Sequence, residues 1–265
     1  MPRALIFVLI VALCGALDIG LHMAGGDLMP MPLSFGALVN QFGFGAVAAV
    51  WIALAFTGMG LVFLVWARRM AGSGRAKGLR YGLALGLMIF VAMFEGVGLL
   101  GTPLIGELIM GLADAIPIAL MIALLGWTLA KDSPDAPVHR PVWPALIAFV
   151  LVYGFGRTGV QLLGLIESGL AERPLPSLIW PFAMGVAVGA LFLALGGALR
   201  GLSRVAGALA FGFGVFGANW ALFMAFVPMV FPDALPDTTL RVGLDILLVT
   251  VAAFMVGLAR RHAAT

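Results

Sequence analysis

Eight apolar stretches, each long enough to cross about 30 Å of hydrocarbon, dominate the chain. Backbone groups find no water inside a bilayer, so each stretch must form a helix. Charged residues make up only 10% of the chain, against about 25% in soluble domains. The sequence therefore predicts an all-α polytopic membrane protein with eight transmembrane helices. The expected spans are residues 4–24, 44–66, 80–100, 105–130, 143–166, 178–199, 205–229 and 240–259.

The basic residues indicate which loops face the cytoplasm. Twelve of the fifteen Lys and Arg residues lie at the two termini and in the even-numbered loops, and the opposite loops hold only two. Because cytoplasmic loops carry the excess of Lys and Arg, we expect both termini in the cytoplasm. Thirteen of the fifteen are Arg, as in GC-rich bacterial genomes, so a bacterial inner membrane is expected. The basic residues are spread over short loops, which argues against a nucleic-acid partner.

Two of the spans contain a charged residue near their middle, Asp18 in the first and Arg157 in the fifth. A charge at that depth costs about 2.5–3.5 kcal/mol to insert, so it indicates a polar interior. Each charge belongs to a stripe with spacing i, i+4, i+8, and one constant shift in residue number superimposes the stripes. The two stripes are Cys14, Asp18, His22 and Tyr153, Arg157, Gln161.

The recurrence of these stripes predicts an internal repeat. A Pro-x-Pro loop, expected to be non-helical, comes after each stripe at residues 30–32 and 174–176. Asp114 and Asp245 then lie near the start of the last predicted helix of each half. Because each half would have four helices, the repeats would be parallel, related by an axis along the membrane normal.

The predicted organisation is therefore a single membrane domain covering residues 1–265. Its half-repeats are expected at about 1–131 and 142–265, joined by a cytoplasmic linker at 132–141.

Counting along the spans places the intramembrane polar residues in the periplasmic half of the bilayer. They predict a polar cleft that opens to the periplasm, with the nearly apolar second and sixth spans facing lipid. The residues expected to bind substrate or ion there are Asp18, Glu95, Asp114, Arg157, Gln161, Asn219 and Asp245.

Several roles remain open for these residues. Asp18 and Arg157 could form an ion pair that fixes the helix register, or Arg157 could bind a carboxylate or phosphate through its forked guanidinium. Asp114 and Asp245 suit the first turns of their predicted helices, where a carboxylate stabilises the helix dipole. Glu95 has no such structural role, and a proton shared with Asp114 and Asp245 would suit proton coupling.

No cofactor, metal ion or catalytic residue is assigned. The chain has one cysteine and no zinc-binding spacing, and His22 is interpreted as an interfacial residue. No nucleophile elbow, Walker loop or His-Glu-x-x-His sequence is present. The tryptophans are interpreted mostly as anchors at the membrane interface; they are Trp51, Trp66, Trp127, Trp143, Trp180 and Trp220.

Three functions fit this pattern. The leading hypothesis is a transporter of a small solute or ion, which could be coupled to protons and in which one half rocks against the other. The second is a membrane enzyme that acts on an outer-leaflet lipid or isoprenoid and uses its carboxylates for acid–base catalysis or to bind a metal. The third is a non-catalytic accessory or assembly protein. The expected partners are the lipid bilayer and a small solute, ion or lipid.

Overall fold

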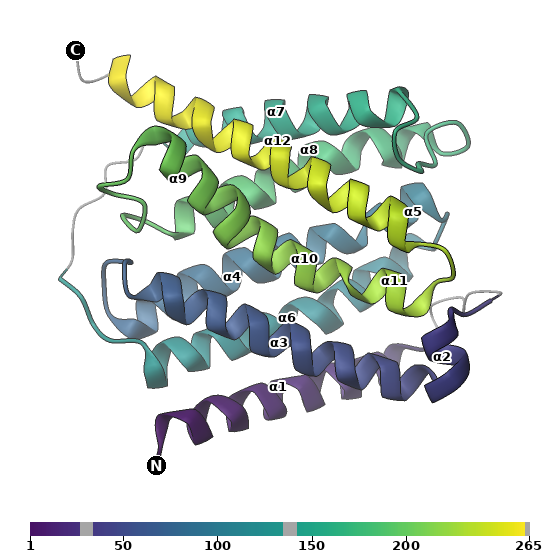
Figure 1. Ribbon diagram of the computed structural model, residues 1–265, viewed down its shortest axis with the longest axis horizontal. Coiled ribbons are helices and arrows are strands. Elements are labelled where there is room, and N and C mark those ends of the chain that lie inside the picture. The colour runs from purple at the N-terminus through teal and green to yellow at the C-terminus, as the bar shows by residue number, and fades with distance from the viewer. Residues whose placement is uncertain (27–33, 135–141, 263–265) are drawn as a thin grey trace.

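The computed structural model describes residues 1–26, 34–134 and 142–262, and it is built from helices (Figure 1). Eight helical segments are long and apolar enough to cross a membrane, so the prediction of an eight-helix membrane protein is confirmed. The eight spans are Arg3–Gly25 (α1), Phe44–Ala67 (α3), Gly74–Leu99 (α4, Gly74–Met93, and α5, Glu95–Leu99), Leu104–Leu129 (α6), Val142–Leu162 (α7), Pro174–Ala194 (α8), Arg204–Val230 (α9 to α11) and Leu235–Gly257, within α12 (Leu235–His262).

Two features of the helices were not predicted from the sequence. A short helix, α2 (Ala37–Phe42), precedes the second span. The seventh span is not a regular α-helix: its parts are α9 (Arg204–Phe211), a π-helical segment η2 (Gly212–Gly217), α10 (Ala218–Met224) and α11 (Phe226–Val230).

Of the loops predicted from the sequence, one is wrong and the others lie wholly or mostly outside the described residues. Residues 174–176, expected to be non-helical, form the first turn of α8, because proline is well suited to the first position of a helix. The matching loop at 30–32 and most of the linker, residues 135–141, lie outside the described residues.

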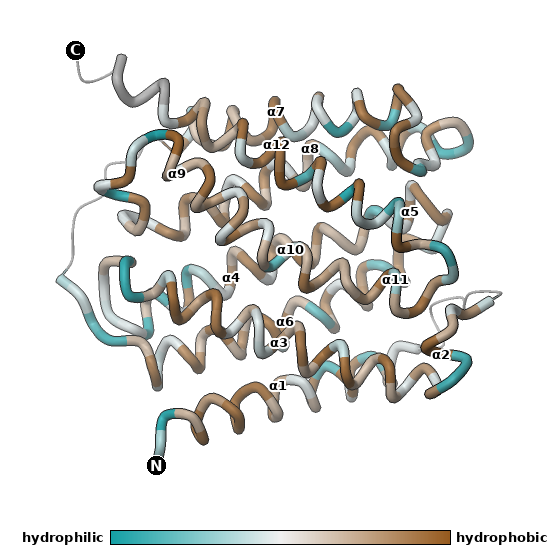
Figure 2. The backbone as a smooth tube through the Cα atoms, viewed as in Figure 1, coloured by the Kyte–Doolittle hydropathy of each residue, from teal (hydrophilic) through white to brown (hydrophobic). Residues whose placement is uncertain are grey.

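Hydrophobic residues run along the helices, and hydrophilic ones gather at the helix ends and at a few places inside the bundle (Figure 2). The N-terminus and the end of α12 lie at the same end of the bundle (Figure 1). We call the opposite end, where α2, α5 and α11 lie, the distal end.

The helices of the first half (α1 to α6) and the second half (α7 to α12) pack in matching pairs. Within the halves, α1 packs against α6 and α7 packs against α12. Between the halves, α4 packs against α8 and α10 packs against α3. The third span of each half therefore lies against the second span of the other.

Two tryptophans donate hydrogen bonds across these contacts between the halves. The indole nitrogen of Trp51 on α3 donates to the carbonyl oxygen of Leu222 at 2.9 Å. Trp180 on α8 donates in the same way to Val91 on α4, at 2.8 Å. Both tryptophans are buried, so their expected role as interface anchors is wrong; the side chains are sequestered because the second and third spans of opposite halves meet at them.

The second and sixth spans were expected to face lipid, and for the sixth this is wrong, whereas 44% of the most apolar stretch of the second, α3, is buried. More than half of the most apolar stretch of α8 is buried, because it packs between α7 and α4. The most exposed span is α1, of which only 22% is buried. Polarity along a span therefore did not indicate its position, since apolar helices can occupy the centre of a bundle as readily as its edge.

The third span of each half begins with the same cap. The hydroxyl oxygen of Ser73 accepts a hydrogen bond from the Ala76 amide at 3.2 Å, and Ser203 does the same with Ala206. A serine at this position satisfies one of the free amides at a helix start. Both third spans therefore begin with a serine N-cap.

Candidate functional site

The charged residues inside the bundle form two separate groups. Asp18 lies on α1 and Arg157 on α7, which run along opposite edges of the bundle (Figure 1). The hypothesis that these two residues form an ion pair is therefore wrong, and the polar residues do not converge on one place. The reason is that the first span of each half packs against the last span of its own half, which brings each charge to different partners.

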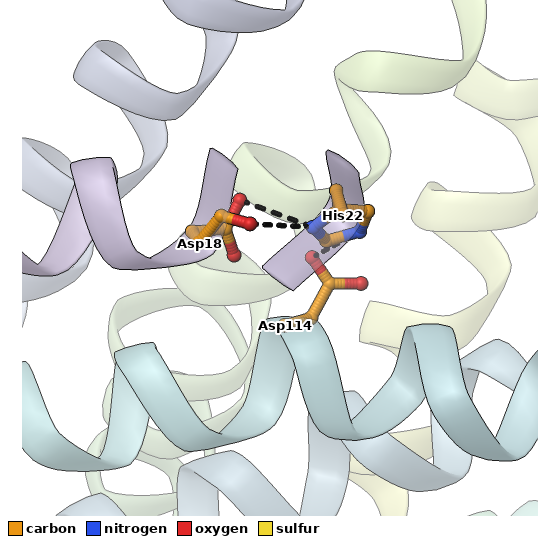
Figure 3. A group of neighbouring side chains, drawn as sticks. All are labelled: Asp18, His22 and Asp114. Carbon is orange, nitrogen blue, oxygen red and sulfur yellow. Dashed lines mark hydrogen bonds and ion pairs between the residues drawn. The ribbon is translucent and has the colours of Figure 1, made fainter. Parts of the chain in front are cut away.

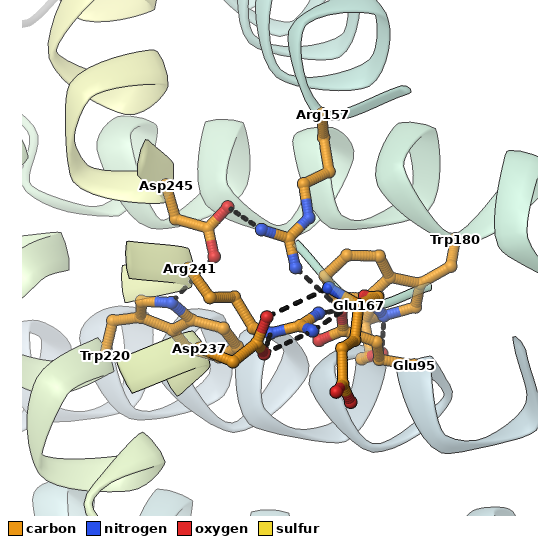
Figure 4. A network of polar contacts seen from close by, with 9 residues as sticks. Glu95, Arg157, Glu167, Trp180, Trp220, Asp237, Arg241 and Asp245 are labelled. Carbon is orange, nitrogen blue, oxygen red and sulfur yellow. Dashed lines mark hydrogen bonds and ion pairs between the residues drawn. The ribbon is translucent and has the colours of Figure 1, made fainter. Parts of the chain in front are cut away.

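The larger group joins the two halves, and we call it the Arg157 network (Figure 4). Its charged members are Glu95 of the first half and Arg157, Asp237, Arg241 and Asp245 of the second. Arg157 is fully buried, and its two terminal nitrogens bind different carboxylates. One donates to Asp245 at 3.0 Å and the other to Glu95 at 2.7 Å. The guanidinium also lies over the ring of Trp180, 5.5 Å from its centre. A planar, permanently charged group with several donors suits such a branched site.

Asp245 is completely buried and both of its carboxylate oxygens are bonded. One accepts the bond from Arg157, and the other accepts a bond of 3.0 Å from the indole nitrogen of Trp220. Because α12 begins at Leu235, Asp245 lies ten residues inside the helix. The suggestion that it stabilises a helix start is therefore wrong, and Trp220 is a hydrogen-bond donor in the core instead of an interface anchor.

Arg241 is a member of the network that the sequence patterns did not reveal. It was counted among the loop residues that set the orientation, but it is only 3% exposed. It donates to Glu95 at 2.5 Å, to Asp237 at 2.7 Å and to the carbonyl oxygen of Glu167 at 2.8 Å. A signal was available in the sequence, because Asp237, Arg241 and Asp245 have the spacing i, i+4, i+8 on one helix.

Glu95 joins the two halves through this network. It lies at the start of α5 in the first half, and its oxygen Oε1 accepts from both Arg157 and Arg241 in the second. A third arginine of the second half, Arg173, donates to the carbonyl oxygens of Gly98 and Leu99 at 2.7 and 2.8 Å. Charged hydrogen bonds thus connect α5 to the second half at the distal end.

A small cavity lies beside the Arg157 network. Its volume of about 10 Å³ is close to what one water molecule needs. Glu95, Gln161 and Ser177 are among the residues that line it. Gln161 and Ser177 are buried, and each has a side-chain oxygen without a hydrogen-bond partner among the described residues. The structure thus places the predicted residue Gln161 next to Glu95.

The first half contains the smaller group, formed by Asp18 and His22 of α1 and Asp114 of α6 (Figure 3). Asp18 and Asp114 are 1% and 4% exposed, whereas His22 is about one-third exposed. His22 lies 3.5 Å from the Asp18 carboxylate and 3.6 Å from that of Asp114. Within the described part of the chain, neither carboxylate oxygen of Asp18 has a hydrogen-bond partner.

The contacts within this group show that the roles inferred from the sequence for His22 and Asp114 were wrong. His22 was taken for an interfacial residue, but it lies between two carboxylates of different helices because α1 packs against α6. Asp114 is ten residues beyond the start of α6 at Leu104, so it does not stabilise the helix start. The proton expected to be shared by Asp114, Glu95 and Asp245 has no common site, because Asp114 belongs to a different group.

Asn219 belongs to neither group. Its amide donates to the hydroxyl of Tyr81 at 2.9 Å and to the carbonyl oxygen of Val215 at 2.7 Å. It therefore joins α10 to α4, between the halves, directly after the π-helical segment.

Comparison with protein-family models, with curated proteins and with solved structures finds no match for this chain. The two groups of charged residues are therefore the features of the structure that bear on function. The Arg157 network can hold the halves together or exchange its bonds with an ion, water or a charged solute. The group at Asp18 offers one imidazole and two carboxylates to a cation.

Proposed function

We propose that the chain transports a small solute or ion across the membrane by moving two four-helix halves against each other. In this proposal the halves are parallel repeats, and the Arg157 network is the contact that opens and closes between them at the distal end. The transported solute would pass the polar groups beside Glu95.

The packing of the helices supports a repeat. Each half joins its first span to its last, and each places its third span on the second span of the other half. The hydrogen bonds of Trp51 and Trp180 repeat this relation, because each runs from the second span of one half to the third span of the other. Two similar halves around one axis are a frequent design of transporters, which move one half against the other.

The single observation that carries the proposal is the position of Glu95. One oxygen of this carboxylate binds two arginines of the opposite half, within a span of an apolar bundle. A buried ion pair adds little stability compared with apolar packing, so a static interface does not need one. Charged groups can, however, exchange each other for water or a solute when an interface opens.

The chemistry of Glu95 also supports coupling to protons. Its ionised carboxylate accepts bonds from Arg157 and Arg241, and a protonated carboxyl group would hold both guanidinium groups less strongly. Proton binding would therefore favour separation of the halves at the distal end. The positions of the basic residues would place this end in the periplasm.

The proposal predicts that the cavity beside Glu95 is reached from each side of the membrane in turn. Cys14 is the only cysteine, so Cys14→Ala gives a background without thiols. A cysteine is then introduced at Ser177, which lines the cavity, and treated with a membrane-impermeant maleimide in right-side-out and inverted vesicles. Phe155→Cys, at a side chain 63% exposed on the outside of α7, is the matched control.

A transporter is expected to show labelling of the Ser177→Cys variant in both vesicle orientations, and none of Phe155→Cys, which would face lipid. Glu95→Gln should increase labelling from the distal side, because it weakens the contact between the halves. Labelling from one side alone, unchanged by Glu95→Gln, would contradict alternating access.

A second candidate is a non-catalytic accessory protein, and it is favoured by one observation. Both oxygens of Asp245 are bonded, to Arg157 and to Trp220, so this part of the network is complete without a ligand. In an accessory protein the network would only fix the helix register. The Ser177→Cys variant of such a protein would then be labelled from one side of the membrane alone, with or without Glu95→Gln.

A further inference from the structure

The group of Asp18, His22 and Asp114 has the geometry of a cation site. One ligand atom from each residue lies within 4.8 Å of the other two (Figure 3). Asp18 and His22 are one turn apart on α1, and Asp114 faces them from α6. Asp18 is 1% exposed and directed into the group, and neither of its carboxylate oxygens is hydrogen-bonded to any described residue, although the Nδ1 of His22 lies 3.5 Å from one of them. A buried carboxylate without such a partner indicates that something binds there.

The imidazole of His22 is oriented as a ligand. Its Nδ1 lies 3.0 Å from the main-chain carbonyl oxygen of Asp18, so we assign the proton of a neutral ring to Nδ1. A hydrogen bond of this kind is the usual support of a metal-binding histidine. The lone pair of Nε2 is then free, and it lies 3.6 Å from a carboxylate oxygen of Asp114.

This distance suits two ligands of one ion. It is too long for a hydrogen bond. With the proton on Nδ1, the lone pairs of Nε2 and of the Asp114 oxygen face each other, and a cation bound between them would remove their repulsion. Two ligands that each lie about 2.1 Å from a tetrahedral metal ion are about 3.4 Å apart. The Nε2 of His22 and the oxygen of Asp114 are close to that separation.

The corresponding place in the second half already contains a cation. The shift in numbering that superimposes the two stripes takes Asp18 to Arg157, and Asp114 and Asp245 each lie ten residues after the first residue of their helices. In the second half the guanidinium of Arg157 lies against Asp245, between the first and last spans. The first half has an aspartate in place of the arginine, so its two carboxylates lack the positive charge that the second half supplies from its own chain.

We propose that Asp18, His22 and Asp114 bind one divalent transition-metal ion, with Zn²⁺ or Mn²⁺ as the best fits. One imidazole nitrogen and two carboxylate oxygens are ligands that these ions accept. Two carboxylates neutralise the charge of the ion in apolar surroundings. Three protein ligands leave a position open for water or another ligand, and His22 is the exposed member of the site. The proposal does not depend on transport.

The test uses the full-length protein, purified without a histidine tag and freed of metal with a chelator. Zn²⁺ and Mn²⁺ are added, and binding is measured by competition with a metal-sensitive dye and by thermal unfolding. We expect one ion per chain and a rise in Tm. His22→Ala and Asp114→Asn should each weaken binding at least tenfold, and His262→Ala, at the other end of the sequence, should leave it unchanged.

Cobalt gives a second measurement that misfolding cannot imitate. Co²⁺ in a site with one histidine and two carboxylates should produce visible absorption bands that Zn²⁺ abolishes. These bands should be absent from His22→Ala, a variant whose folding is checked by gel filtration and by its Tm without metal. Stoichiometric binding that survives both His22→Ala and Asp114→Asn would overturn the proposal. Failure of the unmodified protein to bind any of the three ions would overturn it equally.

Discussion

The carboxylate of Glu95 accepts a hydrogen bond of 2.7 Å from Arg157, although α5 and α7 belong to different halves of the chain. The same oxygen accepts from Arg241 on α12. One oxygen atom therefore links the first half to two helices of the second. At the distal end the halves are joined by charges that can be altered one at a time, which makes the contact between them accessible to mutation.

Removal of the negative charge of Glu95 should destabilise the protein. In Glu95→Gln two buried guanidinium groups lose their shared carboxylate, and we expect a loss of about 2–4 kcal/mol in the free energy of unfolding. Thermal or denaturant unfolding in detergent measures the loss. Glu172→Gln, on an exposed loop of the same end, is the control and should change stability little. Equal stability of the two variants would show that the bonds to Glu95 contribute nothing.

Pairs of substitutions should separate the two groups of charges. The effects of Glu95→Gln and Arg157→Gln should be coupled by about 1–3 kcal/mol, because the two side chains are in contact. The effects of Asp18→Asn and Arg157→Gln should instead add within about 0.5 kcal/mol, since their helices, α1 and α7, run along opposite edges of the bundle. Strong coupling between Asp18 and Arg157 in unfolding experiments would contradict the helix arrangement.

Arg241 should not tolerate replacement by lysine. Its guanidinium binds Glu95, Asp237 and the carbonyl oxygen of Glu167 at the same time, and an ammonium group cannot reproduce that fork. We expect Arg241→Lys to lower the free energy of unfolding by about 1–3 kcal/mol. The equivalent change at Arg69, which is exposed, should have almost no effect. A shift in Tm of similar size at both positions would refute this role.

Replacement of Trp51 or Trp180, the two tryptophans that donate hydrogen bonds between the halves, should lower stability by similar amounts. Trp51→Phe and Trp180→Phe each remove one hydrogen bond to a main-chain carbonyl group while keeping an aromatic ring. We expect each to lower stability by about 1–3 kcal/mol, because a buried carbonyl oxygen loses its partner. Trp143→Phe, at a side chain 73% exposed, is the control. A neutral result at either buried position would mean that the contact is not made.

The fold was predictable from the sequence because its strongest determinant is local. The length and apolarity of a span depend only on its own residues, so all eight spans were found. Helix partners depend on the shapes of several helices at once, and no property of Asp18 alone indicates that α6 is its neighbour. This is why Asp18 was paired with Arg157, and why the buried positions of Trp180 and Trp220 were missed.

The sequence indicated charged residues that lie inside the bundle, but it did not indicate that they form two separate groups. All seven expected residues lie in the bundle, and the two stripes pointed to Asp18 and Arg157, which are both buried. Arg241 was missed because positive charges near a span end were counted as orientation signals. The periodicity Asp237, Arg241, Asp245 on a single helix was the better guide, since it places three charges on one face.

The π-helical segment η2 accounts for a difference in length between the two third spans. Each third span runs from its serine cap to the carbonyl group that accepts a tryptophan bond, from Ser73 to Val91 in the first half and from Ser203 to Leu222 in the second. The second interval contains one additional residue, and Gly212–Gly217 lies within it.

A π turn winds one residue more than an α turn into about the same rotation, so it absorbs an insertion without rotating the helix beyond it. Had the helix stayed regular, one extra residue would have rotated α10 by about 100° and carried Trp220 away from Asp245. If the halves are repeats, as proposed, the π-helical segment marks the insertion of one residue into the second half. The wider turn keeps the indole of Trp220 facing the carboxylate of Asp245.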